Sequence, residues 1–397
     1  MLPYSIYLHI PFCVRRCAYC DFNTYANLEK LIPGYVDALC REAAYLAEAV
    51  GKRLPVHTIF FGGGTPSLLA PHAVGQILGA LAEAFDLQPG AEISLEANPG
   101  TVSLAMLRNL RAWGVNRLSL GMQSADTAEL RLLERVHDLQ DVIRAVGWAR
   151  QAGFENLSLD LIYGLPGQAL ENWLKTLDAA LALNPDHLSL YALTLEQGTP
   201  MQRWVGRGLL DTPDEDLAAD MYEYASQRLE AAGMAQYEIS NWARLDAAGQ
   251  PMACLHNLQY WRNQPYLGLG AGAHGYASGV RTANVLSPAD YIQRLSALDE
   301  KPRPAFPHTP ATANAIVIDR QAEMGETMMM GLRLVRQGVG ALGFEERFGV
   351  SLQSAYGVAI ERLVGQGLLE WVREPQTSLR LTQRGRLLGN RVFMEFI

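Results

Sequence analysis

Three cysteines near the start of the chain are the residues best suited to chemistry. Cys13, Cys17 and Cys20 have the spacing C-x3-C-x2-C within the run HIPFCVRRCAYCDF. Three thiols this close cannot all pair with one another as disulfides, but they can surround one soft metal centre. A [4Fe–4S] cluster normally takes four thiolates, so three would leave one iron for another ligand. The alternative is a structural zinc site completed by His9 or a distant cysteine. The chain has no second C-x2-4-C pair, which favours the cluster.

The glycine-rich run GGGTP at positions 62–66 follows an apolar segment. It is not a Walker A loop, because no Lys-Ser/Thr follows, and it is not G-x-G-x-x-G. Glycines allow a backbone to approach a ligand closely and to adopt positive φ. Taken alone, the run is explained equally well as a tight turn between a strand and a helix.

Four polar residues come at or just after the ends of expected strands or helices: Glu96, Gln123, Arg135 and Asp160. Any one of them alone would be interpreted as a helix cap or a surface residue. Together they suit a ligand with hydroxyl and carboxylate groups. The two carboxylates can accept hydrogen bonds from ribose hydroxyls or an amine, and the arginine can pair with a carboxylate.

A second segment of interest, CLHNLQYW, covers positions 254–261. One interpretation is an aromatic packing segment that contains a single hydrogen-bonded histidine. The other is that His256 is a metal ligand, a common role for an imidazole, with Cys254 as second choice. If the segment is helical, Tyr260 and Trp261 supply apolar surface about one turn further on. His274, in the run GLGAGAHG, is a weaker alternative ligand.

Short apolar runs alternate with helical patterns through the first two hundred residues, which predicts parallel βα units. The expected strands are Ser5–Ile10, His57–Phe61, Glu92–Ala97, Arg117–Gly121, Leu157–Tyr163 and His187–Tyr191. The expected helices are Ile32–Val50, Val74–Phe85, Leu104–Trp113, Leu139–Gln151 and Asn172–Leu183. Six units are too few for a closed eightfold barrel, so the pattern favours an open or partial barrel. In such folds the active-site residues lie at the carboxyl ends of the strands.

The pattern changes after residue 191. A helix is expected over Pro213–Ala232 and another over Ser287–Leu298, separated by a Gly- and aromatic-rich stretch. The proline-rich segment Lys301–Thr309 is typical of a linker. Beyond it the pattern predicts a small winged-helix-like module with helices Glu323–Leu332, Gly340–Phe348 and Ala355–Gly365 and a hairpin of Leu368–Val372 and Leu379–Thr382. We interpret this module as a lid or docking domain and the three consecutive methionines 328–330 as core filling.

Composition narrows the possible classes of protein. The 397 residues carry a net charge of -8, which argues against a general nucleic-acid binder. The five cysteines do not form a disulfide framework, and Cys40 fits a buried position on a helix. The start lacks a signal-peptide pattern, and no apolar run of about 18 residues suggests a membrane helix. We therefore expect a cytoplasmic protein.

The cysteine motif after an apolar strand resembles the signature of the radical S-adenosylmethionine (SAM) superfamily. The resemblance extends through GGGTP, SLE, GMQS and DLIYGLP in the same order. It implies a partial (βα)6 barrel in which the three cysteines hold a [4Fe–4S] cluster and SAM binds the fourth iron. It also implies SAM contacts from Tyr7, Tyr19, Gly63, Gly64, Thr65, Glu96, Gln123, Arg135 and Asp160. Cleavage of SAM would yield methionine and a 5′-deoxyadenosyl radical.

Two branches of that superfamily are similar to this chain: the oxygen-independent coproporphyrinogen III oxidases and the HemW-type haem chaperones. The oxidase branch carries a fourth cysteine two residues after the third, where this sequence has Phe22. It also carries an N-terminal extension, whereas only six residues precede Tyr7 here. The H-N-x-x-Y-W motif that begins at His256 resembles one in the chaperone branch. These features favour the chaperone over the oxidase or another SAM-radical enzyme, and a structural iron–sulfur protein fits least well.

The resemblance implies a division into a radical SAM barrel (1–200), a barrel extension with the H-N-x-x-Y-W motif (201–300) and a HemN-like C-terminal domain (311–397). It implies three cofactors: a [4Fe–4S] cluster, SAM and haem, with His256 as haem ligand. The expected partners are a haem-accepting protein and an electron donor such as a flavodoxin or ferredoxin. We expect no nucleic-acid partner and no transmembrane segment, and we keep peripheral contact with a membrane as an open alternative. Whether the chain acts as an enzyme is left open.

Overall fold

The computed structural model describes residues 2–296 and 304–397. Contacts within the chain define two compact units: Met1–Ala225 with Pro265–Ile316, and Ser226–Gln264 with Val317–Ile397. The grouping differs from the segments inferred from sequence, because residues 226–264 cluster with the C-terminal part. The three domain segments therefore stay a prediction, and positions 297–300 of the middle one lie outside the described residues.

The first unit is built on parallel strands. Neighbouring strands in order are β1 (Tyr4–Ile10), β4 (Pro55–Gly63), β5 (Asp86–Ala97), β6 (Arg117–Gln123), β7 (Asn156–Tyr163) and β8 (His187–Ala192). Every pairing among these six strands is parallel. Each strand lies where the alternating sequence pattern predicts one. The expected α/β fold of a partial (βα)6 barrel is therefore confirmed.

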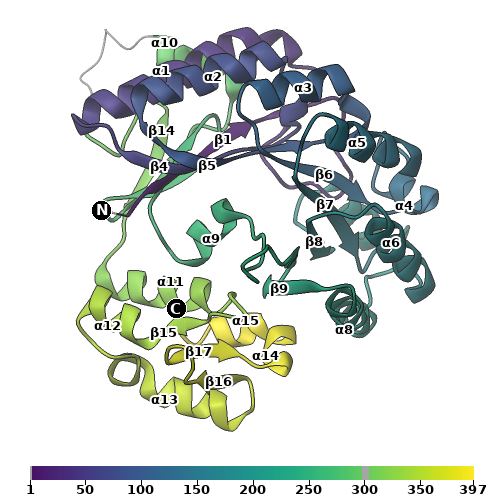
Figure 1. Ribbon diagram of the computed structural model, residues 1–397, viewed down its shortest axis with the longest axis vertical. Helices are drawn as coiled ribbons and strands as arrows, with labels where there is room; N and C mark the ends of the chain where they lie inside the picture. The colour runs from purple at the N-terminus through teal and green to yellow at the C-terminus, as the bar shows by residue number, and fades with distance from the viewer. Residues whose placement is uncertain (1, 297–303) are drawn as a thin grey trace. The chain divides into compact units, whose positions relative to one another are not determined.

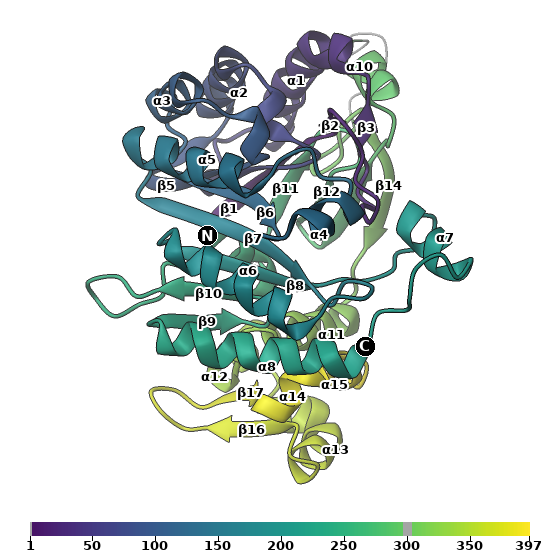
Figure 2. The same cartoon turned by 90° about the vertical axis from the view of Figure 1, so that its right-hand side faces the viewer.

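Helices cover the outer side of these strands (Figures 1 and 2). They are α1 (Ile32–Val50), α2 (Pro71–Ala84), α3 (Leu104–Ala112), α5 (Leu139–Gln151) and α6 (Leu170–Ala182). Local signals begin several of them: Asp138 caps α5 in a capping box with Asp141, and Ser103 caps α3. A short helix that the pattern did not predict, α4 (Thr127–Leu132), begins at the cap Asp126. Arg135 follows this helix three residues after its end.

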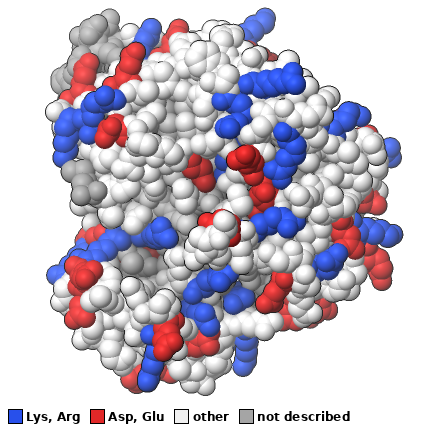
Figure 3. Space-filling view, in the orientation of Figure 1, with Lys and Arg blue, Asp and Glu red and all other residues white. Residues whose placement is uncertain are grey.

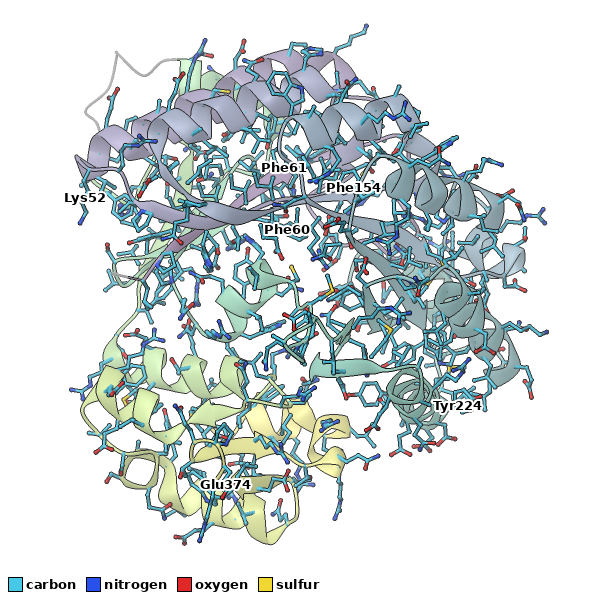
Figure 4. All side chains as sticks on the ribbon, in the orientation of Figure 1. Lys52, Phe60, Phe61, Phe154, Tyr224 and Glu374 are labelled. Carbon is cyan, nitrogen blue, oxygen red and sulfur yellow. The ribbon has the colours of Figure 1, made fainter. Side chains whose placement is uncertain are left out.

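Side chains along β4 point alternately to the buried core and to the opposite face of the sheet. Phe61 is fully buried, whereas the preceding Phe60 is partly exposed. The two side chains point to opposite faces of the strand (Figure 4). Phe60 stacks on Tyr7 of β1, with ring centroids 6.4 Å apart. Aromatic packing on the inner face therefore holds Tyr7 beside the glycine run that ends β4.

The Gly- and aromatic-rich stretch that follows residue 237 is more regular than expected. Strand β11 (Tyr266–Leu269) pairs in parallel with β1, and β12 (His274–Ala277), β13 (Val280–Asn284) and β14 (Thr312–Val317) continue the sheet beyond it. The helix expected at Ser287–Leu298 is α10 (Pro288–Ser296), with residues 297 and 298 outside the described residues.

The proline-rich segment Lys301–Thr309 is not a free linker over its described part. Thr309 is buried and its hydroxyl donates to Glu42 Oε1 at 2.8 Å, and Tyr45 donates to the Pro304 carbonyl at 2.9 Å. Residues 301–303 lie outside the described residues. Because of its prolines, the segment shows neither a helical nor a strand pattern in the sequence. In the structure, hydrogen bonds to Glu42 and Tyr45 hold its described part against α1.

The second unit contains a hairpin, helices and a small sheet. Strands β9 (Met234–Glu238) and β10 (Asn241–Arg244) form the hairpin, and α9 (Leu255–Trp261) follows; α8 (Glu215–Ala231) leads into this unit. After α11 (Arg320–Gly331), α12 (Ala341–Phe348) and α13 (Leu352–Gly365), the antiparallel strands β16 (Leu369–Val372) and β17 (Ser378–Leu381) pair, with β15 (Val339–Gly340) beside β17. The chain ends in α14 (Gln383–Leu387) and α15 (Gly389–Phe393). Met328 is buried in the core and Met329 packs against it, as the core-filling interpretation predicts.

Charged side chains of both signs are mixed over short distances on the face drawn in Figure 3. This mixture agrees with the modest excess of Asp and Glu, 41 against 33 Lys and Arg. Along residues 2–296 and 304–397, no helix is both long and apolar enough to cross a membrane.

Candidate metal and cofactor site

The three cysteines lie in one loop between β1 and α1. Cys13 is buried at the end of β2 (Phe12–Cys13), which pairs with β3 (Tyr25–Ala26), while Cys17 and Cys20 are partly exposed. All three are free thiols. Burial raises the pKa of Cys13 and Cys20, and the neighbouring thiols add to the rise. The thiols are thus close enough to interact, and thiolates select soft metals.

Among the described residues, no three His, Cys, Asp or Glu side chains stand in a metal-binding arrangement. The assignment of the three cysteines as ligands therefore rests on their thiol chemistry, spacing and shared loop. The alternative fourth ligands are engaged elsewhere. His9 uses both ring nitrogens, Nδ1 with the Tyr7 hydroxyl at 3.0 Å and Nε2 with the Asn23 carbonyl at 2.9 Å. Cys40 contacts the Gln76 carbonyl instead.

The glycine run that ends β4 lies directly against the cysteine loop. Gly64 N donates to the Ile10 carbonyl and Thr65 N donates to the Phe12 carbonyl, both at 2.8 Å. A Cβ on Gly64 would lie 2.7 Å from the Phe12 carbonyl oxygen and 3.1 Å from Cys13 Sγ. The Thr65 hydroxyl lies 3.7 Å from the same sulfur. Only glycine at position 64 allows this approach, so the run is more than a tight turn.

Two carboxylates come from the parallel strands β5 and β7, which lie on either side of β6. Glu96 Oε2 accepts from Gly63 N at 3.2 Å, where Gly63 has a φ of 110°. Asp160 accepts from the Ser119 hydroxyl at 3.1 and 3.0 Å through its two oxygens. Burial raises the pKa of Glu96 to about 7, and the charge of Asp160 adds to the rise. Burial also raises the pKa of Asp160, against the hydrogen bonds from its serine neighbours.

Arg135 joins the end of β6 to the cysteine loop. Its Nη2 donates to the Gly121 carbonyl at 2.9 Å and its Nη1 lies 3.6 Å from Cys17 Sγ. A Cβ on Gly121 would lie 2.8 Å from Gln123 Nε2 and 3.0 Å from Arg135 Nη2, so the two polar groups meet at this glycine. Within the described structure, the buried Arg135 Nε has no hydrogen-bond partner. The positive charge of Arg135 beside the thiols, together with this Nε donor, suits the binding of an anionic group at this place.

The tyrosines named from the sequence also lie at this site. Burial raises the pKa of the Tyr7 hydroxyl, and the charge of Glu96 adds to the rise. Tyr19 packs in a cluster with Leu133 and Ile162, and burial raises its pKa while the Arg135 charge opposes the rise. The structure therefore links every residue proposed for SAM contact to another member of the set or to the cysteine loop.

Two residues near the site were not singled out from the sequence. Ser119 holds Asp160, and its position two residues before Gly121 on β6 was the available signal, because alternate strand residues share a face. His137 contacts the Met122 carbonyl through Nε2 at 3.1 Å. Burial, followed by the Arg135 charge, lowers the pKa of His137 to about 4, so the imidazole is neutral near pH 7.

His256 lies in the second unit, on α9. It is buried, its Nε2 is 2.9 Å from the Tyr260 hydroxyl, and the two rings are perpendicular with centroids 5.0 Å apart. Trp261 packs instead with Tyr237 and Leu258, under the Arg333 guanidinium at 4.7 Å. The predicted helix is therefore present, and it places Tyr260, rather than Trp261, on the histidine side.

The two lesser candidates differ in setting. Cys254 is fully buried where α9 begins, and its backbone N donates to the Tyr237 hydroxyl at 3.4 Å. His274 is exposed at the start of β12 in the first unit. Of the alternatives considered from the sequence, only His274 has an exposed side chain.

The chain is similar to known proteins over almost its whole length. Residues 7–180 match the model of the radical SAM superfamily, and residues 318–388 match that of the HemN C-terminal domain. The "Heme chaperone HemW" of Bacillus subtilis is 38% identical over 99% of this chain and 99% of its own length. The chain belongs to the HemW family of radical SAM proteins.

The HemW family matches extend beyond one lineage. The relative of that name from Mycobacterium tuberculosis is 39% identical over 98% of this chain and 94% of its own. The mouse "Radical S-adenosyl methionine domain-containing protein 1, mitochondrial" is 38% identical over 92% and 81%. Among solved structures, the coproporphyrinogen III oxidase HemN of Escherichia coli superposes with a TM-score of 0.81 at 26% identity, covering 99% of this chain and 90% of that one. This chain thus shares its fold with that oxidase.

Proposed function

We propose that this protein is a haem chaperone that binds a [4Fe–4S] cluster, SAM and haem and delivers haem to an acceptor protein. The observation that carries the proposal is the meeting of three elements at one place: the cysteine loop, the Gly63–Thr65 run and Arg135. The full-length similarity to proteins named as haem chaperones supports the haem part. An electron donor such as a flavodoxin or ferredoxin and a cytoplasmic location belong to the same proposal.

In the proposal, Cys13, Cys17 and Cys20 hold the cluster. When bound, the reduced cluster supplies the electron that cleaves SAM. The chain's own residues bind and orient SAM. Arg135 offers its buried Nε to the SAM carboxylate, and Glu96 and Asp160 accept from the amine or the ribose hydroxyls. Tyr7, Tyr19, Gly63, Gly64, Thr65 and Gln123 complete the set.

His256 is proposed as the haem ligand. Its Nε2 is engaged by the Tyr260 hydroxyl, so coordination through that atom requires the hydrogen bond to break. The perpendicular Tyr260 ring lies beside the imidazole and would then offer apolar surface to a porphyrin. In the proposal, the Tyr260 hydroxyl therefore competes with haem iron for His256 Nε2. The Tyr260→Phe variant removes this hydroxyl and so tests the competition.

The second candidate function is oxygen-independent coproporphyrinogen III oxidation, which the TM-score of 0.81 to that oxidase favours. Phe22 argues against it, since the oxidase branch has a cysteine there. The Phe22 side chain is 62% exposed beside the cysteine loop. The two candidates differ in what the reconstituted protein does with haem and with coproporphyrinogen.

The deciding experiment uses anaerobically reconstituted protein in two assays. Hemin titration should give a Soret band, with the affinity of His256→Ala lowered about tenfold or more and that of Tyr260→Phe equal to or above wild type. His274→Ala is the matched control and should bind as wild type does. If only the His274→Ala variant lost hemin binding, His274 rather than His256 would be the haem ligand. Turnover of coproporphyrinogen III without hemin binding would replace the chaperone by the oxidase.

A further inference from the structure

The side chain of Asn23, three residues after Cys20, joins the cysteine loop to two distant segments. Its Nδ2 donates to the Ala271 carbonyl at 3.1 Å and to the Leu286 carbonyl at 2.9 Å. Its Oδ1 accepts from the Tyr25 hydroxyl at 3.0 Å. The amide therefore uses both donors and its acceptor, which fixes its position and orientation.

The backbone of Asn23 is held from the opposite side. Its carbonyl accepts from His9 Nε2 at 2.9 Å, and the Tyr7 hydroxyl engages the other ring nitrogen of His9 at 3.0 Å. Strand β1 thus contacts the far end of the loop that it leads into. The loop from Cys13 to Cys20 is closed at one residue by hydrogen bonds in two directions.

The run GLGAGAHG, which the SAM chemistry does not use, supplies the surface for this closure. Gly270 has a φ of 104°, and a Cβ there would lie 2.6 Å from the His9 carbonyl oxygen. Gly272 has a φ of 78°, and a Cβ there would lie 2.4 Å from Asn23 Nδ2. Both positions favour glycine because of their positive φ and because another residue approaches closely: His9 of β1 at Gly270, and Asn23 of the cysteine loop at Gly272.

A buried carboxylate on α1 holds the 270–272 turn in place. Glu42 on α1 accepts four hydrogen bonds, each between 2.6 and 2.9 Å, from Gly270 N, Asn284 Nδ2, Tyr291 Oη and Thr309 Oγ1. The Tyr35 hydroxyl links the same turn to β1, since it accepts from Ala271 N at 2.7 Å and donates to the His9 carbonyl at 2.8 Å. The surface that receives Asn23 is therefore rigid.

We propose that Asn23 is a positioning residue that holds the cysteine loop on the 270–272 turn and so keeps Cys17 and Cys20 placed for the cluster. The inference rests on the proposed function for the identity of the cluster, while the contacts that carry it do not depend on any cofactor. Those contacts run from a fixed turn, through one amide, to the loop that bears the thiols.

The test compares Asn23→Asp with Asn116→Asp. The first change keeps the size of the side chain but replaces the NH2 group, which donates twice, by one oxygen that faces two carbonyls. Asn116 makes an equivalent bridge away from the cysteines, with its Oδ1 accepting from Ile93 N and its Nδ2 donating to the Ala91 carbonyl, both at 2.8 Å. It controls for the general cost of losing such a bridge.

Two readouts are needed. In the metal-free full-length protein, trypsin should cut after the exposed Arg15 or Arg16 about tenfold faster in Asn23→Asp than in Asn116→Asp, because the loop is released. In the reconstituted protein, only Asn23→Asp should show a shifted midpoint potential and an altered EPR spectrum of the reduced cluster. Asn116→Asp should match wild type in both, even if its melting temperature falls.

Each result decides a different claim. Equal tryptic rates and identical spectra in the two variants would overturn the positioning role while leaving the cluster intact in wild type. A wild-type chain that takes up no iron and sulfide would overturn the proposed function. The tryptic comparison would then still decide whether Asn23 holds the loop, but its role toward a cluster would be refuted.

Discussion

Arg135 Nη1 lies 3.6 Å from Cys17 Sγ, although 118 residues separate the two in sequence. The same guanidinium donates to the Gly121 carbonyl at 2.9 Å, so it connects the carboxyl end of β6 with the cysteine loop. A fixed cation at this position can hold an anionic ligand beside the thiols. This relationship makes Arg135 the residue whose replacement tests the cofactor site most directly.

Replacing Arg135 by Met should weaken SAM binding about tenfold or more, because the variant lacks the charged partner that we propose for the SAM carboxylate. Cluster assembly should persist, since the three cysteines remain. Equilibrium dialysis of the reconstituted protein with labelled SAM measures the affinity. Arg131→Met, an exposed arginine on α4, is the matched control. Equal affinity in the two variants would remove Arg135 from the site.

Replacing Cys13, Cys17 or Cys20 by Ala should abolish the broad iron–sulfur absorbance and the bound iron and sulfide. In the proposed cluster each thiol would supply one of three ligands, and two do not hold a cubane. Cys40→Ala should keep a full complement of iron, because Cys40 lies on α1, outside the C-x3-C-x2-C motif, and contacts the Gln76 carbonyl of α2. Retention of full iron and sulfide by the triple variant would refute the cluster assignment.

Replacing Gly64 by Ala should displace the glycine run from the cysteine loop, because the new Cβ would lie 2.7 Å from a backbone carbonyl oxygen. We expect a loss of stability of about 1 to 3 kcal/mol and a lower iron content after reconstitution. Gly79→Ala on α2 is the control, since a Cβ there meets nothing within 4 Å. It should stabilise the protein by about 0.5 to 1 kcal/mol. Urea titration of the metal-free chain measures both changes, and a neutral Gly64→Ala would refute the close contact.

Glu96 predicts a pH dependence of stability in the metal-free protein. Its folded-state pKa is raised to about 7, above the ordinary value for a glutamate, so the folded chain keeps a proton that the unfolded chain has lost. Stability from this group therefore falls as pH rises from about 4.5 to 7, by about 1 to 3 kcal/mol. Glu96→Gln should flatten that part of the profile, whereas Glu83→Gln, on the exposed side of α2, should not. Identical profiles for wild type and Glu96→Gln, measured by urea unfolding at each pH, would show that the carboxyl is not perturbed.

Much of the first unit followed from local pattern. Alternation of apolar residues placed six strands. It also placed Glu96 next to the last residue of β5 and Asp160 within β7, and the two lie close enough for the charge of Asp160 to raise the pKa of Glu96. The run of residues 237–279 did not follow. Its strands β11 and β12 have four residues each, one of them a glycine, so they are too short to show the apolar alternation from which a strand is recognised.

The sequence by itself determined the chemistry on offer: three thiols at C-x3-C-x2-C, a glycine run after a strand, and carboxylates and an arginine at element ends. These features are local, so spacing and residue type are enough to find them. Only the tertiary structure decided which partners meet. The contact of Arg135 with Cys17, the fit of Gly64 against Phe12 and the closure of the loop by Asn23 on Ala271 each join residues far apart in the chain. Such contacts depend on strand order and on how closely backbones approach, and neither quantity is encoded in any short stretch of residues.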